Sequence, residues 1–343
     1  MNSYCDTILR MKTEILEFSD SSLIIAAKII HNGGLVAFPT ETVYGLGANA
    51  YDVEAVKSIY VAKGRPSDNP LIVHVYNNQM IEQIAYVDER AKKIIQAFMP
   101  GSLTIVLPKK ECIPMEVTAH LETVAIRMPK SLQARRFIEA CQTPIAAPSA
   151  NTSSRPSPTN AVTVYEDMQG RIPLILKGED SVVGIESTVL DCAHNKAVIL
   201  RPGVVTATDI QSKTGVDVCY LPDNADLSKV NSPGLRYKHY APQCPMLLNI
   251  DGDISKVKEK IQQLNLIGKK VVVITENKHL VDFSIENVID LGKDIETISN
   301  RLFSCLRIAE KQADVIIAIF TDTSEKAKGV NNRILKSCGG NLI

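Results

Sequence analysis

Apolar residues recur at regular intervals in short segments of the chain and predict alternating strands and helices. Within 71–76 the residues at every second position are aliphatic, which predicts a strand with one face in a core. Within 23–30 apolar residues recur at helical spacing, which predicts a helix capped by Ser21 or Ser22. Strands that alternate with helices along a chain indicate an α/β fold.

The same two periods predict the other elements. Strands are expected at 35–38, 102–107, 123–129, 145–147, 174–177 and 197–200, and further on at 246–250, 270–275, 288–291 and 315–320. Helices are expected at 88–98, 131–141, 254–263 and 294–313, and after Asp52, whose side chain can cap a helix that leads to Lys63.

The chain has 343 residues, which predicts two domains because one domain typically takes ~150 residues. We expect a larger domain at 1–205 and an ordered linker at 206–243, where the periodicity fades and a basic, aromatic segment lies between prolines. A smaller parallel α/β domain is expected at 244–343, since its predicted strands and helices alternate.

Composition excludes several classes of protein. Lys plus Arg and Asp plus Glu both number 38, so any anion site must be local. There is no apolar run of ~20 residues and no signal peptide, so we expect a cytoplasmic protein without membrane association. The eight cysteines are scattered and form no CxxC pair, which predicts neither a metal site nor a disulfide framework.

The segment KGRPSDNP predicts a loop that binds anions. Lys63 and Arg65 lie two residues apart, and the glycine and proline that follow them stop a helix, so both cations can face one ligand. His74, in the strand that follows, would face the same site. The alternative is a solvated turn beside a histidine at a strand edge.

Polar residues also follow other predicted strands. Thr40 and Thr42 lie in PTETVYGLG after the first strand, and Ser149 and Asn151 lie in PSAN after 145–147. Ligands of α/β sheets bind at such carboxyl ends. The alternatives are that the threonines simply favour a strand and that the serine and asparagine cap a turn.

Arg127 interrupts an apolar strand. A buried arginine is costly unless it is paired, so we expect Arg127 to face a carboxylate, either of the protein or of a ligand. The nearby GLGANA imitates a dinucleotide-binding fingerprint. Its predicted context lacks an acidic residue at a strand end ~20 residues further on, which argues against a nicotinamide or flavin site.

Together these motifs resemble the threonylcarbamoyl-AMP synthases, the YrdC-domain enzymes of tRNA modification, in their long two-domain form. The resemblance runs from about Leu23 to Gly203 through PTETVYGLG, KGRPSDNPLIVH, PGSLTIVL, VAIRMP, APSAN, SPT, VGIESTVLD and ILRPG, and SPGLRYKHYAP continues it. The loop 151–154 departs from the family, which usually has glycine after the serine.

The resemblance implies an open, twisted mixed sheet with a concave basic cleft, followed by a smaller Rossmann-like domain. It implies a nucleotidyltransferase that forms threonylcarbamoyl-AMP and pyrophosphate from L-threonine, bicarbonate and ATP, with Mg²⁺ on the ATP phosphates. The product would pass to a tRNA threonylcarbamoyltransferase complex to make threonylcarbamoyladenosine (t6A), and the synthase itself would need no stable contact with nucleic acid.

The resemblance also implies roles for individual residues. Lys63 and Arg65 would be catalytic. ATP would be bound by Lys63, Arg65, Asn69, Thr123, Ser149, Asn151, Ser157, Arg201 and, from the linker, Tyr237. Threonine would be bound by Thr40, Thr42, His74, Arg127, Ala147 and Ser187, with Arg127 as the partner of its carboxylate. Apart from the resemblance, the prolines at both ends of 233–242 and the aromatic Tyr237 among cations predict that this part of the linker closes over the site as a lid that excludes water. The alternative is a spacer that only joins the two domains.

Two alternatives come from other classes. The first is an RNA-binding module with a basic concave face, which the zero net charge and the low aromatic content of 5% disfavour. The second is a carbamoyl-adenylate enzyme of the hydrogenase-maturation type. That enzyme would bring CxxC zinc fingers and an acylphosphatase-like region, and the sequence has neither.

Overall fold

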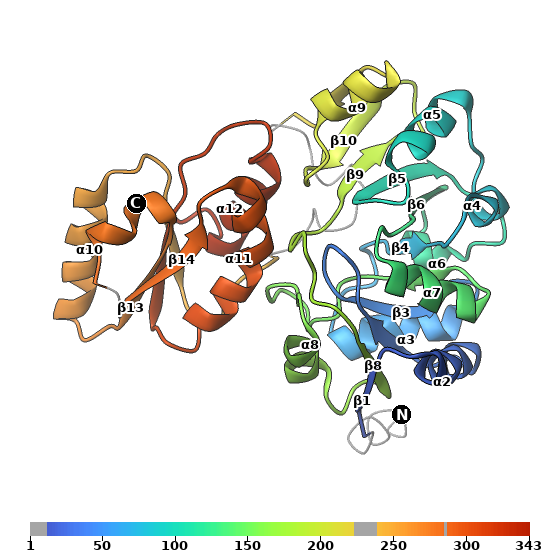
Figure 1. The fold of residues 1–343 in the computed structure, drawn as a ribbon, viewed down its shortest axis with the longest axis horizontal. Helices are drawn as coiled ribbons and strands as arrows, with labels where there is room; N and C mark the ends of the chain where they lie inside the picture. Colours follow the sequence, from blue (N-terminus) through green and yellow to red (C-terminus); the bar gives the residue numbers. More distant parts are fainter. Residues whose placement is uncertain (1–11, 223–238, 285–286) are drawn as a thin grey trace. The chain divides into compact units, whose positions relative to one another are not determined.

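The computed structural model describes residues 12–222, 239–284 and 287–343, and within them the chain divides into two compact units. The first unit consists of the described residues in the ranges 1–153, 158–182 and 186–236 (Figure 1). The second lies within 154–157, 183–185 and 237–343. The domain boundaries at 205 and 243 stay predictions.

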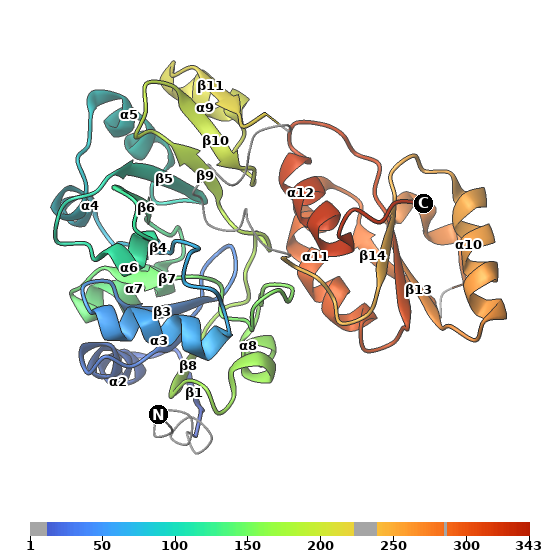
Figure 2. The same ribbon diagram turned by 180° about the vertical axis from the view of Figure 1, so that it is seen from behind.

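A mixed sheet runs through the first unit. Its described strands are β1 (Glu14–Glu17), β2 (Val36–Phe38), β3 (Gly45–Asn49), β4 (Ile72–His74), β5 (Leu103–Pro108), β6 (Thr123–Arg127), β7 (Ile145–Ala147), β8 (Leu174–Lys177), β9 (Thr188–Asp191), β10 (Ala197–Arg201) and β11 (Val218–Tyr220). They form an 11-stranded sheet in the order β1-β8-β2-β3-β7-β4-β6-β5-β9-β10-β11, with β1 beside β8 at one edge (Figure 2). Parallel and antiparallel pairs both occur, so the predicted mixed sheet is confirmed.

Helices cover this sheet. They are α2 (Asp20–His31), α3 (Val53–Lys63), α4 (Asn78–Ile84), α5 (Glu89–Phe98), α6 (Met115–Thr118), α7 (Leu132–Cys141), α8 (Ala161–Met168) and α9 (Ala207–Thr214). Asp52 caps α3 as predicted, by accepting hydrogen bonds from the N–H groups of Glu54 and Ala55. The cap of α2 is Ser19 rather than Ser21 or Ser22, because Ser19 and Ser22 form a reciprocal capping box.

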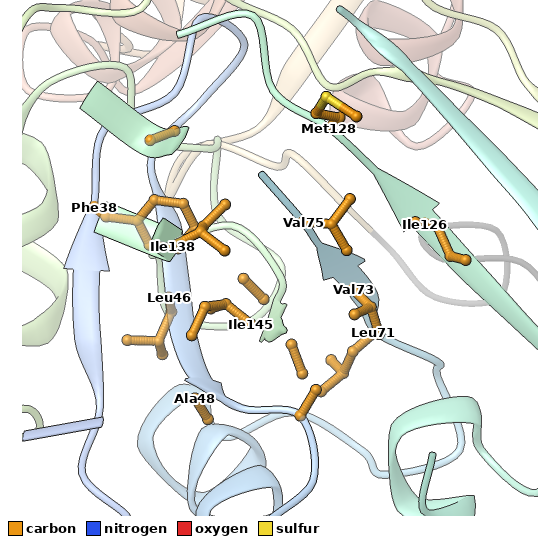
Figure 3. Close-up of a cluster of buried hydrophobic side chains, with 14 of the residues drawn as sticks. Phe38, Leu46, Ala48, Leu71, Val73, Val75, Ile126, Met128, Ile138 and Ile145 are labelled. Atoms are coloured by element: carbon orange, nitrogen blue, oxygen red, sulfur yellow. The ribbon is translucent and has the colours of Figure 1, made fainter. Parts of the chain in front are cut away.

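The core of the first unit lies between the sheet and its helices. By their register, Leu46, Val73 and Ile126 point to one face of the sheet, whereas Phe38 lies on the other face, against the ring of His74 (Figure 3). All four are fully buried. Every residue of β2 and β4 is buried, so the sheet is covered on both faces here, and His74 is buried on the face opposite to Val73.

The GLGANA segment forms strand β3 and not a turn before a helix. Its glycines have a packing role, because an added Cβ would lie 2.9 Å from the ring of Phe38 at Gly45 and 2.7 Å from Ile145 at Gly47. The expectation that no dinucleotide fingerprint operates here therefore has a structural reason.

The second unit is a smaller α/β layer. Its strands are β12 (Met246–Asn249), β13 (Val271–Glu276), β14 (Val288–Gly292) and β15 (Val315–Ile319), and all their pairings are parallel in the order β12-β15-β13-β14. Its helices are α10 (Ile254–Leu266), η1 (Asn277–Asp282), α11 (Ile295–Ala309) and α12 (Lys328–Cys338). The predicted parallel sheet is confirmed, whereas α12 was not predicted.

Among the described residues, no helix is both long enough and apolar enough to span a bilayer.

Candidate functional site

The site is built on one face of the sheet where β4 and β6 end side by side. These strands are parallel and in register, so His74 lies directly opposite Arg127 and Ile72 lies opposite Ala125. Side chains two residues apart on a strand share a face, which puts a polar pair at the strand ends and an apolar pair beside it. His74 and Arg127 are both buried.

Arg127 is held by three protein groups. Its Nε donates to the carbonyl of Gly101 at 3.2 Å, and one terminal nitrogen donates to Thr42 Oγ1 at 2.7 Å. The other terminal nitrogen lies 2.7 Å from Glu41 Oε1. Of the two carboxylates that the sequence allowed as a partner, the structure shows the one that belongs to the protein.

Glu41 is the site residue to which sequence reasoning gave no role. Its carboxylate also accepts the N–H groups of Lys130 at 2.9 Å and Ser131 at 3.2 Å, just before α7. Burial alone would raise the pKa of the Glu41 carboxyl, but the charge of Arg127 and these N–H groups hold that pKa below its usual value. The signal in the sequence was an acidic residue between two threonines, directly after a buried strand.

The two predicted threonines form a chain of hydrogen bonds that leads to Arg127. Thr40 Oγ1 donates to the carbonyl of Val43 at 2.6 Å and lies 3.0 Å from Thr42 Oγ1. Because the Thr40 hydroxyl donates its proton to Val43, it can only accept from Thr42. The Thr42 hydroxyl therefore donates to Thr40 and accepts from Arg127. Thr42 is 0% exposed, so its observed role is to hold Arg127.

His74 is an uncharged histidine in this setting. Burial, and then the charge of Arg127, lower the pKa of His74 to about 3. Its Nδ1 donates to the carbonyl of Ile72 at 3.1 Å, and its ring packs edge-on against Phe38 with 5.8 Å between centroids. With its single N–H on Nδ1, this neutral, fixed imidazole leaves Nε2 as an acceptor for a hydrogen bond from a ligand and adds no charge.

Hydroxyl groups on β5 and next to β9 extend the polar pair of His74 and Arg127. We call these side chains together the polar row. Thr104 Oγ1 lies 2.7 Å from Ser187 Oγ. Arg201 donates to the carbonyl of Ser187 at 2.9 Å and to its hydroxyl at 3.3 Å. Thr104 was not predicted, although a lone threonine inside the apolar strand LTIVL was a usable signal.

Lys63 is the last residue of α3, and Gly64 ends the helix in a left-handed conformation with φ of 61°. The Lys63 ammonium donates to the carbonyls of Ser149 and of Asn151, the second at 2.6 Å. The side chain is 3% exposed, so it does not lie on a solvated turn. Burial lowers the pKa of Lys63 well below its usual value, and the charge of Arg65 lowers it further.

The segment that Lys63 holds is itself ordered by side chains. Ser149 Oγ donates to Asn151 Oδ1 at 2.5 Å, and the N–H of Thr152 donates to Asp167 at 3.2 Å. Gly45 and Ser149 are bridged, which ties the segment to β3. The predicted pair Ser149 and Asn151 therefore lies next to the Lys63 ammonium.

The other predicted residues are more spread out. Ala147 ends β7 opposite Ile72, Thr123 begins β6, and Asn69 is buried in the loop before β4. Arg65 is half-buried. Ser157 is buried and belongs to the second unit by its contacts. Tyr237 lies outside the described residues. The assignments of individual residues to ATP and to threonine all stay predictions.

An apolar strip lies beside the polar row on the same face of the sheet. Its buried members come from β4, β5, β6, β9 and β10 and form a cluster separate from the main core: Ile72, Val106, Ala125, Val189 and Leu200. An apolar strip next to a few placed polar groups is the usual lining of a small-molecule site.

Nothing in the described part of the chain resembles a metal cage. No three His, Cys, Asp or Glu side chains gather there, and the described cysteines are free. Glu41, the carboxylate beside the polar row, is already ion-paired with Arg127 and accepts hydrogen bonds from two N–H groups.

A mixed-sheet α/β unit with buried cations, hydroxyl groups and an apolar strip on one face is suited to bind a small anionic molecule. The family profile described as "Telomere recombination" (Sua5, YciO and YrdC) matches residues 28–203, and "Threonylcarbamoyl-AMP synthase, C-terminal domain" matches residues 205–339. The chain belongs to the threonylcarbamoyl-AMP synthase family, as the sequence predicted.

Relatives match along almost the whole chain. The threonylcarbamoyl-AMP synthase of Pyrococcus abyssi is 42% identical over 328 residues, covering 93% of this chain and 94% of the relative. That of Bacillus subtilis is 42% identical over 340 residues, covering 96% and 97%. The crystal structure of P. abyssi Sua5 complexed with L-threonine is 39% identical, covers 97% of this chain and 98% of that chain, and superposes with a TM-score of 0.89.

Proposed function

We propose that this chain is an L-threonylcarbamoyladenylate synthase that joins L-threonine, bicarbonate and ATP into threonylcarbamoyl-AMP and releases pyrophosphate. Family membership supports the reaction, and a relative has been crystallised with L-threonine. The observation that carries the proposal is the face of the sheet where Arg127, His74 and Ser187 lie beside an apolar strip.

The polar row suits the amino acid. In our proposal Arg127 meets the carboxylate of threonine, and His74, Ser187, Thr40, Thr42 and the backbone of Ala147 complete the site. A guanidinium in a water-poor pocket binds a carboxylate through short, charge-assisted hydrogen bonds. The neutral state of His74 keeps a second positive charge away from the amine of threonine, which must lose a proton before it reacts.

The chemistry needs position and charge more than a strong base. The amine nitrogen of threonine bonds to the carbon of bicarbonate, and a water molecule leaves. The product is a carbamate. A carbamate oxygen then bonds to the α-phosphorus of ATP, and the bond from that phosphorus to the bridging oxygen of pyrophosphate breaks. Because the attacking oxygen is already anionic, the protein has to align the groups and offset the phosphate charge.

Lys63 and Arg65 are our candidates for that charge. Lys63 is buried at the C-terminus of α3, and phosphate oxygens beside it would favour its charged form. Its bonds to two carbonyls keep Ser149 and Asn151 close to the ammonium. We assign ATP to these residues with Asn69, Thr123, Ser157, Arg201 and Tyr237, and place the adenine over the apolar strip.

We expect Mg²⁺ to arrive on the ATP phosphates, because this ion is usually bound through substrate phosphates and only one or two protein carboxylates. The metal would neutralise charge on the phosphates, while Lys63 and Arg65 orient them. We expect a cytoplasmic enzyme whose adenylate passes to a tRNA threonylcarbamoyltransferase complex. The mixed anhydride hydrolyses readily in water, so a lid formed by the linker would protect it until transfer.

The test is pyrophosphate release from ATP by the purified chain, with L-threonine, L-serine and bicarbonate added or omitted in turn. We expect release only when bicarbonate and L-threonine are both present, and less with L-serine. Equal release without an amino acid would contradict the proposal. Salt-sensitive binding of RNA without threonine-dependent release would instead favour the RNA-binding alternative.

A further inference from the structure

The guanidinium of Arg127 is fixed before any ligand arrives, and one carboxylate does most to fix it. We propose that Glu41 is a positioning residue for substrate binding, which holds the guanidinium of Arg127 aimed at the carboxylate of the amino acid. This inference rests on the proposed function. Its observation is the buried pair between Arg127 and Glu41 Oε1 at 2.7 Å.

Glu41 does not simply occupy the place of an absent substrate carboxylate. Its Oε1 also accepts the N–H of Lys130, and its Oε2 accepts the N–H of Ser131, the residue that caps α7. A carboxylate that swung away when threonine bound would leave both buried N–H groups without an acceptor, which is costly. Glu41 therefore stays in place when the site fills.

The contacts of Arg127 leave donors for a ligand. A guanidinium carries five N–H groups. Within the described residues, Nε donates to Gly101 and one terminal nitrogen donates to Thr42, while the other terminal nitrogen is ion-paired with Glu41 at 2.7 Å but makes no hydrogen bond. At least one N–H on each terminal nitrogen therefore remains, and two such donors match the two oxygens of a carboxylate.

The charge of Glu41 matters because both partners are buried. Arg127 is 4% exposed and Glu41 is 7% exposed, so neither is solvated well enough to stand alone. Without the negative charge, Arg127 would turn toward other acceptors, and its two remaining N–H groups would no longer face one carboxylate. The affinity for threonine would fall, while the site for ATP would keep its own contacts.

The decisive variant is Glu41→Gln in the full chain, with Glu139→Gln on the exposed side of α7 as its matched control. Pyrophosphate release is measured against the concentrations of threonine and of ATP. We expect the KM for threonine to rise roughly tenfold or more and the KM for ATP to stay within about twofold, since a tenfold change in affinity is typical of one weakened charged contact. The control should leave both KM values unchanged.

A double variant tests whether Glu41 acts through Arg127. If it does, Glu41→Gln combined with Arg127→Lys has the same KM for threonine as Arg127→Lys alone, within about twofold. If the two effects multiply, Glu41 acts independently of Arg127 and the inference is wrong. An unchanged KM for threonine in folded Glu41→Gln would also overturn it.

A loss of folding is covered by a second variant. If Glu41→Gln does not fold, Glu41→Asp is measured instead. Its side chain keeps the negative charge but is one methylene shorter, so the carboxylate lies farther from Arg127. The KM for threonine should then rise severalfold. An unchanged KM in Glu41→Asp would overturn the inference. Failure of the proposed function looks different, because the parent protein itself would then show no threonine-dependent release.

Discussion

His74 links the chemistry of one side chain to the stability of the protein. Burial and the charge of Arg127 lower its pKa to about 3 in the folded state, from a usual value of 6.5. Between these values the unfolded chain binds a proton that the folded chain does not. Stability therefore rises with pH in this window, is complete above about 6.5, and is lost as the pH falls toward 3.

We predict that the free energy of unfolding of the parent falls as the pH is lowered from 6.5 to 4.5, with a contribution from His74 of up to about 1.4 kcal/mol per pH unit. His74→Gln should have a shallower slope in denaturant unfolding at a series of pH values. His31→Gln, at an exposed position of α2, is the control and should keep the slope of the parent. Parallel slopes for His74→Gln and the parent would contradict the burial of a neutral imidazole.

At the residue scale, the sequence indicated which polar residues lie in the site more often than it indicated which residues they contact. Arg127 was expected to meet a carboxylate, and it does, but no spacing in the sequence could name Glu41, which is 86 residues away. Lys63 was allowed as part of a solvated turn and is buried against two carbonyls of a distant strand end. Such partners are chosen by tertiary contacts, which local patterns do not contain.

Gly64 shows how one element presents the site. It ends α3 with φ of 61°, and an added Cβ would meet nothing within 4 Å. A substitution there would cost only backbone strain, without a steric clash. Because Gly64 separates Lys63 from Arg65, that strain would fall on the two proposed phosphate ligands.

Gly215 gives a matched comparison, since it ends α9 with φ of 70° and is equally open. We predict that Gly64→Ala and Gly215→Ala each lower the free energy of unfolding by about 1 kcal/mol. Only Gly64→Ala should also lower turnover, roughly tenfold or more, because small displacements of catalytic groups are costly. The measurements are denaturant unfolding and pyrophosphate release. Equal turnover in both variants would mean that the conformation at Gly64 does not position the cations.

At the element scale, helices with a capping residue were predicted, but short strands were predicted only in part. The side chains of Asp52 and Asp88 accept hydrogen bonds at the starts of α3 and α5, where the sequence placed those helices. Strands β2 and β7 were predicted although each has three residues, whereas β9 and β11 were not, because three or four residues define a period poorly. The strand in GLGANA was not predicted either, because glycine has no side chain whose burial could reveal a strand.

The extent of the first unit matters for the whole molecule. The segment 206–222 contains α9 and β11, and β11 pairs with β10 in the large sheet. Ile210 is fully buried, and Val218 joins it in the core cluster of that unit. The predicted linker thus begins with residues that pack into the first unit.

We predict that a chain ending at 203 is less stable than one ending at 222 by at least about 2 kcal/mol, the cost of losing one buried isoleucine. Thermal and denaturant unfolding of the two truncated chains measure this difference. Equal stability would show that 206–222 contributes nothing to the first unit and would support the boundary at 205.

The sequence by itself determined the fold class, the family and most of the polar groups of the site. These depend on hydrophobic periods and on contiguous motifs, which are local properties of the chain. Tertiary structure decided which groups meet: Glu41 with Arg127, Lys63 with the carbonyls after β7, and Thr104 with Ser187. The reason is that burial makes an unpaired charge or hydroxyl costly, and only the folded sheet sets which buried partners lie within reach.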